Sequence, residues 1–211
     1  MCESLVAFYK GVKVLRYDLE NDLSNRNLIT EMIIPIWQKY EPWTTYNDVY
    51  QTVSRKVGRT IDILFDEDGA VLGFYIFRVF KYGSWKVMFR GNTFISSSIR
   101  GIGVLLLKSA IKHYSPDKIV TFTSEERIYA LLNHFGEIVP ALNKKISLDE
   151  WQLLSKLAGS TYELDKDTLM VRDFYQYKHQ RQGNFVKSEY VRSLFGALGK
   201  KDAYALLVRC K

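Results

Sequence analysis

The chain has 211 residues, of which 47% are hydrophobic, 25% are charged and only 4 are proline. This composition is that of a globular protein, and it excludes a disordered, collagen-like or low-complexity chain. No stretch approaches the roughly 20 apolar residues of a membrane span, and residues 1–4 lack the order of a secretory signal, so we expect no membrane span and a cytoplasmic protein. Two cysteines are too few for a disulfide framework or a zinc site.

The net charge of +7 is concentrated in the C-terminal part of the sequence. Residues 172–211 carry nine Lys or Arg against three acidic residues, a net +6. One interpretation is a basic patch that attracts an acidic partner, such as an acyl carrier protein or a nucleic acid, and the other is a solvated face that keeps the protein soluble. In the first case the following residues are expected to share one surface: Lys178, Arg181, Lys187, Arg192, Lys200 and Lys201.

Hydrophobic periodicity and turn signals predict the secondary structure in chain order. The expected elements are a strand at 13–17, helices at 29–40 and 46–57, strands at 60–65, 71–77 and 85–95, a helix from 101 that ends before 116, a strand at 119–123, helices at 124–135 and 147–158, and strands near 168–171 and 203–209. Residues 160–201 are otherwise ambiguous between helix and loop.

Local signals set several of the boundaries. Pro35 lies inside the first helix and predicts a kink or an early end. Ser124 is expected to cap the helix that follows residue 123, and Gly136 to end it. Ser147 and Glu150 have the spacing of a capping box at the start of the next helix.

The predicted order of strand, two helices, three strands, helix, strand and helix indicates a mixed α/β sheet and not an alternating βαβ series. We expect a core at residues 1–140, a helical or irregular elaboration at 141–201, and a closing strand of the core sheet at 202–211.

One segment carries a chemical signal, because a strand end at residue 95 leads through a polar loop into a helix with Gly101 and Gly103 at its start. The first turn of a helix leaves backbone N–H groups without intrahelical acceptors, and glycine lets an anion approach them. Arg100 adds a positive charge. The segment lacks the Gly-Lys-Ser/Thr of a P-loop and the third glycine of a dinucleotide motif. It predicts a phosphate site, and a glycine pair used only for close helix packing is the alternative.

The element order and this loop resemble the GNAT superfamily of N-acetyltransferases over residues 12–140 and the closing strand. The family motif is Gln/Arg-x-x-Gly-x-Gly/Ala. Gly101 and Gly103 match its glycines and Arg100 matches the frequent basic residue before them, whereas Ser98 stands where the family has Gln or Arg.

The resemblance implies a GNAT-like acyl-CoA N-acyltransferase fold with an extended C-terminal region, acetyl-CoA or another acyl-CoA as co-substrate, and no metal. In this family the pyrophosphate lies on backbone N–H groups of the loop, the thioester lies beside the preceding strand end, and the acceptor amine attacks directly in a ternary complex. The implied cofactor-binding residues are Phe94, Ile95, Arg100, Gly101, Ile102, Gly103 and Val104.

The proton-handling residues depart from the family pattern. Leu132 stands where many members have a tyrosine, and Tyr129, on a similar helix face, is the candidate general acid. Glu125 is the candidate base, with Glu126 beside it, because no carboxylate occurs at residues 87–99. Packing of Tyr129 in the core is the alternative to its catalytic role.

Two classes of function follow. The first is an acyltransferase that acts on an amine acceptor, which the segment from Arg100 to Gly103 favours. The second is a non-catalytic module that senses acyl-CoA, or that binds nucleic acid through the basic C-terminal region, and Leu132 favours this second class.

Overall fold

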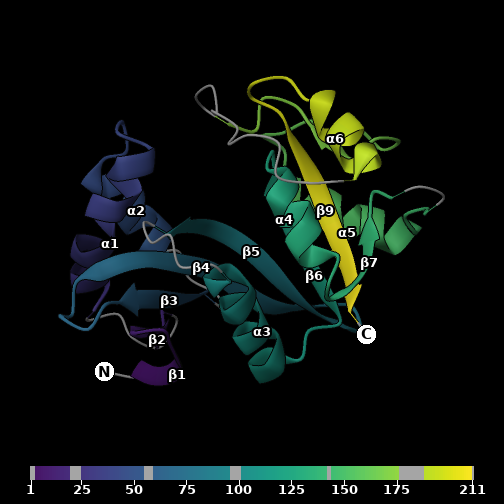
Figure 1. Ribbon diagram of the computed structural model, residues 1–211. Coiled ribbons are helices and arrows are strands. Elements are labelled where there is room, and N and C mark those ends of the chain that lie inside the picture. Colours follow the sequence, from purple (N-terminus) through teal and green to yellow (C-terminus); the bar gives the residue numbers. More distant parts are fainter. Residues whose placement is uncertain are drawn as a thin grey trace. The chain divides into compact units, whose positions relative to one another are not determined.

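The computed structural model describes residues 3–19, 25–54, 59–95, 101–141, 144–175 and 188–210. Within these ranges, nine strands and six helices form two compact units, which are drawn in Figure 1. The first unit comprises residues 1–81 and 88–115, and the second comprises residues 82–87 and 116–211. The predicted mixed α/β class is confirmed.

The elements follow one another in this order: β1 (Glu3–Tyr9), β2 (Val12–Asp18), α1 (Arg26–Tyr40), α2 (Tyr46–Ser54), β3 (Arg59–Phe65), β4 (Val71–Tyr82), β5 (Trp85–Ile95), α3 (Ile102–Tyr114), β6 (Lys118–Thr123), α4 (Glu126–Leu132), β7 (Gly136–Val139), α5 (Leu148–Ala158), β8 (Met170–Val171), α6 (Glu189–Gly196) and β9 (Ala203–Cys210). Each predicted element is present, whereas β1, β7 and α6 were not predicted. The proposed domain boundaries at residues 140 and 201 stay a prediction.

The sheet of the first unit has the order β1-β2-β3-β4-β5, and its first three pairs are antiparallel. Alternate residues of β2 and β3 face α1 and α2, which cover one side of this sheet. The buried cluster on that side contains Leu15, Tyr17, Ile61, Ile63, Phe74 and Ile76 from the strands and Ile29, Ile33, Trp37, Val49 and Val53 from the helices.

The opposite face of this sheet holds a buried ion pair beneath α3. Arg16 and Asp62 are direct neighbours across β2 and β3, and two guanidinium nitrogens donate to the carboxylate at 2.7 and 2.8 Å. The guanidinium also lies over the rings of Phe77 and Tyr114, 5.4 and 5.5 Å from their centroids. Because Tyr114 belongs to the last turn of α3, these contacts fasten that helix to the sheet.

The first helix does not end early at Pro35, as the sequence allowed, but continues to Tyr40. Proline in a helix interior costs about 3 kcal/mol. The buried side chains of Ile33 and Trp37 lie on either side of Pro35 and pack into the same cluster. Their burial holds both parts of the helix on the sheet. The N-cap of α1 is Asn25, whose side chain makes no capping hydrogen bond.

The second unit is built around β9, which pairs antiparallel with β6, β7 and β8. The start of β5 adjoins β6 in this unit, where the backbone N–H of Asp117 donates to the carbonyl of Lys86 at 2.8 Å. Residues 203–208 are buried without exception, as expected of a closing strand. The strand predicted at 203–209 is therefore confirmed.

Two boundary predictions around α4 are wrong. The N-cap is Glu125 and not Ser124, because the backbone N–H of Glu125 bonds to the hydroxyl of Thr123 at 3.1 Å and delays the start of the helix. Gly136 does not end the helix but begins β7. A Cβ at this glycine would stand 2.1 Å from the carbonyl oxygen of Arg209, so the close approach of β7 to β9 requires glycine.

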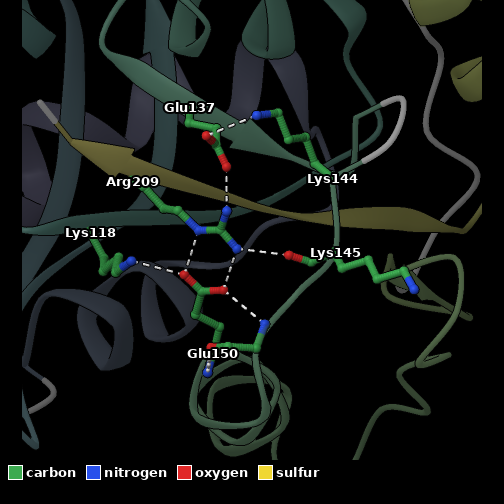
Figure 2. Close-up of polar contacts among 7 residues, drawn as sticks. Lys118, Glu137, Lys144, Lys145, Glu150 and Arg209 are labelled. Carbon is green, nitrogen blue, oxygen red and sulfur yellow. Dashed lines mark hydrogen bonds and ion pairs between the residues drawn. The ribbon is translucent and has the colours of Figure 1, made fainter.

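The capping box at α5 is confirmed, and its glutamate also binds two strands of the second unit. Glu150 is only 2% exposed, and its carboxylate accepts hydrogen bonds from the backbone N–H of Ser147, from Lys118 on β6 and from Arg209 on β9 (Figure 2). Arg209 also pairs with Glu137 of β7. Burial alone would raise the carboxyl pKa, but the hydrogen bonds from Arg209 and Lys118 outweigh it and hold the pKa of Glu150 far below its usual range.

Candidate functional site

The predicted phosphate site lies in the first unit, between the end of β5 and the start of α3. Gly101 occupies the N-cap position in the left-handed region, with φ of 90°. The first intrahelical bond runs from the N–H of Leu105 to the carbonyl of Gly101, at 3.1 Å. The backbone N–H groups of residues 102–104 therefore have no acceptor within the helix.

The backbone at this helix start is open. A Cβ built at Gly103 would meet no heavy atom within 4 Å among the described residues, and one built at Gly101 would meet only the hydroxyl of Tyr9, at 3.9 Å. The first turn of α3 carries no acidic residue, although those of α2, α4, α5 and α6 each do. The partial positive charge of this helix end is thus not neutralised by the helix's own side chains.

These two glycines serve different purposes. Gly101 is needed for its positive φ, which L-residues rarely adopt. Among the described residues, Gly103 has neither a positive φ nor a heavy atom within 4 Å of a Cβ built on it, so no described contact supports the alternative that it serves close helix packing. An uncovered backbone is what a bulky anion requires in order to reach the N–H groups.

The end of β5 is fixed against α1. The half-buried ring of Phe94 lies 5.4 Å from the rings of both Trp37 and Tyr40, and the Tyr40 hydroxyl donates to the carbonyl oxygen of Ile95 at 2.6 Å. Arg100, expected to add a charge, lies outside the described residues. The placement of a thioester beside Phe94 and Ile95 stays a prediction.

Sequence reasoning missed one neighbour of the glycine loop, because it did not predict β1. Tyr9, the last residue of β1, brings its hydroxyl near Gly101, and the ammonium of Lys10 lies 5.2 Å from the Tyr9 ring centroid. Both side chains are suited to an anion, one as a hydrogen-bond donor and the other as a cation. The apolar run in Leu5–Tyr9 was the only available signal for this strand.

The two candidate proton-handling residues both lie at α4, in the second unit. Tyr129 is 5% exposed, its hydroxyl donates to the carbonyl of Pro140 at 3.0 Å, and burial raises the pKa of Tyr129 to about 12. Glu125 pairs with Arg127 at 3.3 Å. One carboxylate oxygen of Glu126 is buried without a hydrogen-bond partner in the described part of the chain. Its raised pKa makes the hydroxyl of Tyr129 a weaker acid than an exposed tyrosine. The catalytic roles of these residues stay predictions.

The basic C-terminal residues are described in part. Arg192, Lys200 and Lys201 are exposed, while Lys178, Arg181 and Lys187 lie outside the described ranges. The expectation that all six share a surface therefore stays a prediction. No described helix combines the length and the apolar character that crossing a bilayer demands.

Comparisons with known proteins relate the fold to acetyltransferases. No protein-family model and no curated protein matches the sequence. Among solved structures the chain is similar to Tetrahymena GCN5, with 15% identity over 65% of this chain and 85% of that one and a TM-score of 0.46. It is also similar to a probable acetyltransferase, with 14% identity over 64% of this chain and 95% of that one and a TM-score of 0.47.

A third similar structure is an aminoglycoside acetyltransferase from an uncultured soil sample, in complex with sisomicin. Its identity is 11% over 50% of this chain and 70% of that one, with a TM-score of 0.38. At such identities and TM-scores, activity has to be inferred from the residues of the chain itself.

Proposed function

We propose that this protein is an N-acyltransferase that moves an acetyl or other acyl group from acyl-CoA to an amine acceptor. The observation that carries the proposal is the open helix start at α3, where Gly101 sets the backbone and Gly103 leaves it uncovered. The pyrophosphate of coenzyme A has the charge and size for such a place. Three backbone N–H groups, from Ile102, Gly103 and Val104, have no acceptor within the helix and are proposed to donate to it.

The residues present fit this ligand. The first turn of α3 has no carboxylate that would repel a phosphate, and Lys112 and His113 in its last turn suit the negative end of the helix. Arg100, directly before the glycines in the sequence, adds a cation to the same loop. Tyr9 supplies a hydroxyl close to Gly101.

The proposed chemistry is direct transfer. The neutral amine nitrogen attacks the thioester carbonyl carbon, a carbon–nitrogen bond forms, the carbon–sulfur bond breaks, and the amine proton is lost while the thiolate gains one. The products are an amide and coenzyme A. Tyr129 is proposed to give a proton to the thiolate and Glu125 to receive one from the amine.

Positioning supplies most of the expected rate, because holding both reactants together turns a bimolecular step into an effectively unimolecular one. The chain's part is to bind the phosphates at α3 and to keep the end of β5 in place. The hydrogen bond from Tyr40 to Ile95 serves the second task.

The direct test is calorimetric titration with acetyl-CoA, followed by mass spectrometry of an amine library incubated with acetyl-CoA and the protein. Binding together with an acetylated amine is the expected result. Binding without any product would identify a non-catalytic acyl-CoA sensor, and the absence of binding would refute the proposal. To block the site, Gly103→Glu is preferred to a substitution of Gly101. The backbone at position 101 has a positive φ, which would strain any residue other than glycine.

An acidic partner at the basic C-terminal region belongs to the same proposal. Nine cations against three acidic residues at 172–211 support it. Such binding weakens with salt, because the Debye length falls from about 30 Å at 0.01 M to about 8 Å at 0.15 M. A salt series with an acyl carrier protein and short RNA or DNA tests it, and no binding at low salt would leave the region a solvated surface.

A further inference from the structure

Strand β1 forms an edge of the sheet. Among the described strands it has a neighbour on one side only, β2, with which it pairs antiparallel (Figure 1). The backbone N–H and C=O groups on its other side can pair with a further strand. Two large apolar side chains of β1 are also exposed, Leu5 by 63% and Phe8 by 68%. This strand therefore offers both backbone groups and apolar surface to a partner.

A bulge in β1 places these two side chains on the same face of the sheet. Leu5 lies opposite Leu15 of β2, and Phe8 lies opposite Lys13, with a register shift between residues 5 and 7. Directly opposite residues of an antiparallel pair share a face, and so do positions 13 and 15 of one strand. Without the extra residue, Leu5 and Phe8 would point to opposite faces. With it, they form an apolar strip on the side of the sheet on which α1 and α2 pack.

The sequence of β1 lacks most of the features that keep an edge strand from pairing. Proteins usually protect such edges with charged side chains, proline or a bulge. Residues 4–9 contain no charged residue and no proline, in a chain of which 25% of the residues are charged. The bulge is present, but its effect is to gather apolar side chains on one face. This composition favours a partner that covers the strand.

A second copy of this chain fits the edge, because β1 can pair with itself. If two copies pair antiparallel about a two-fold axis between residues 6 and 7, Leu5 of each copy lies opposite Phe8 of the partner subunit. Both contacts fall on the same face of the joined sheets, since this axis is perpendicular to them. Residues 4–9 are uncharged, so no like charges meet within the pairing. Each copy uses its own edge, and the assembly therefore closes as a dimer.

We propose that this protein forms a two-fold symmetric dimer in which the β1 strands of two copies pair antiparallel, with Leu5 of each opposite Phe8 of the partner subunit. Each copy contributes a short strand edge and two exposed apolar side chains. For so small an interface we expect a dissociation constant on the order of 10 μM. The dimer does not depend on the proposed transferase activity, and it is measured without acyl-CoA.

Sedimentation equilibrium over a concentration series from about 1 μM to about 500 μM tests the association. The mean mass should rise from 24.6 kDa toward twice that value. Hydrogen exchange at both ends of the series locates the interface, because strand pairing protects backbone amides. The amides of residues 4–9 should exchange more slowly at the higher concentration, and those of α5 should not change.

Leu5→Glu should raise the dissociation constant about tenfold, because it sets a carboxylate opposite a phenylalanine at two symmetric places. Leu148→Glu is the matched control, since Leu148 is 65% exposed at the start of α5, in the second unit. Both variants lower the positive net charge by one, so charge repulsion between copies cannot explain a loss in Leu5→Glu alone. Both replaced side chains are exposed, and the urea midpoints should stay those of the parent protein.

A mixture of the Leu5→Glu and Phe8→Lys proteins tests the register. In each homodimer, both contacts between positions 5 and 8 are mismatched. In the mixed dimer, one contact is the native pair of Leu5 with Phe8, and the other joins the introduced carboxylate to the introduced ammonium. The mixture should therefore associate about tenfold more tightly than either variant alone.

Four results would each overturn the proposal. The first is a parent protein that stays monomeric at the highest concentration. The second is hydrogen exchange at residues 4–9 that does not depend on concentration, which would mean that β1 is not the interface. The others are a loss of association in Leu148→Glu as large as that in Leu5→Glu, and a mixture that associates no more tightly than its components.

Discussion

The helices α3 and α5 differ in how the backbone N–H groups of their first turns are bonded. At α5 the Ser147 hydroxyl accepts from the N–H of Glu150 at 3.3 Å, and the Glu150 carboxylate accepts from the N–H of Ser147 at 3.0 Å. At α3 the N-cap is Gly101, which has no side chain to accept a bond, and no acid occurs in the first turn.

This difference separates a helix start built for stability from one suited to a ligand. Relative to a side-chain cap, a glycine N-cap costs only roughly a few tenths of a kcal/mol, and the described residues leave the backbone of α3 uncovered at Gly103. The N–H groups that have no acceptor within α3 are what an external anion would satisfy. The α5 start is closed by the chain's own carboxylate and offers no such place.

The largest expected effect comes from giving α3 a carboxylate of its own. Gly103→Glu should lower the affinity for acetyl-CoA about a thousandfold, or about 4 kcal/mol, because the new anion competes with the phosphates and repels them. Calorimetry measures the change. Gly103→Ala is the matched control and should stay within about threefold, since a Cβ there meets nothing. A folded Gly103→Glu protein that binds like the parent would contradict the assignment of the site.

The converse change removes the negative charge of the carboxylate that caps the start of α5. Glu150→Gln leaves Arg209 and Lys118 without their buried partner and should lower the free energy of unfolding by about 3 kcal/mol. Urea denaturation measures this, and the affinity for acetyl-CoA should not change. Asp149→Asn, in the same turn but exposed, should alter stability by less than about 0.5 kcal/mol. Equal losses in the two variants would show that the buried network adds nothing.

Acid should remove the contribution of the Glu150 carboxylate to the stability of the protein. Because the folded pKa of Glu150 lies below the ordinary 4.5, its contribution to stability is present above that value and is lost as the pH falls below it. The unfolded chain takes up the proton first. Urea midpoints measured from about pH 6 to pH 3 should fall with a steeper slope in the parent protein than in Glu150→Gln. Parallel curves would mean that another carboxyl dominates.

The smallest expected effect concerns Tyr129. Its hydroxyl already donates a hydrogen bond within the protein, just as the N–H groups at the start of α5 are bonded to side chains of the protein. Tyr129→Phe removes the bond to Pro140 and should cost about 1 kcal/mol of stability. As the proposed proton donor it should also lower turnover about tenfold to a hundredfold, which does not exceed the low end for general acid catalysis. Steady-state rates with the identified amine measure the change. Unchanged turnover would assign Tyr129 to the core alone.

The main elements were predictable because their signals are local. The strand pattern from Thr60 and the turn around Gly83 define β3, β4 and β5, and the spacing of Ser147 and Glu150 defines the start of α5. The errors arise where tertiary contacts override local preference. Pro35 is tolerated because buried residues on both sides hold the helix. Strand β1, whose Leu5 and Phe8 are exposed, lacks the alternation of a half-buried strand.

The candidate site was predictable for a similar reason. Gly101 and Gly103 carry their signal in the sequence, because a strand end, a polar loop and glycines at a helix start occur together. Tyr9 could not be found this way, since its approach to Gly101 depends on the pairing of β1 with β2.

The tight contact at Gly136 should limit which substitutions the protein tolerates at this position. Since any side chain there would collide with the Arg209 carbonyl, variants at Gly136 should disappear from a saturation library sorted for cellular abundance. Variants at Gly103 should survive that sort and disappear only when the same library is selected for activity. Gly136 would thus be constrained by folding, and Gly103 by activity.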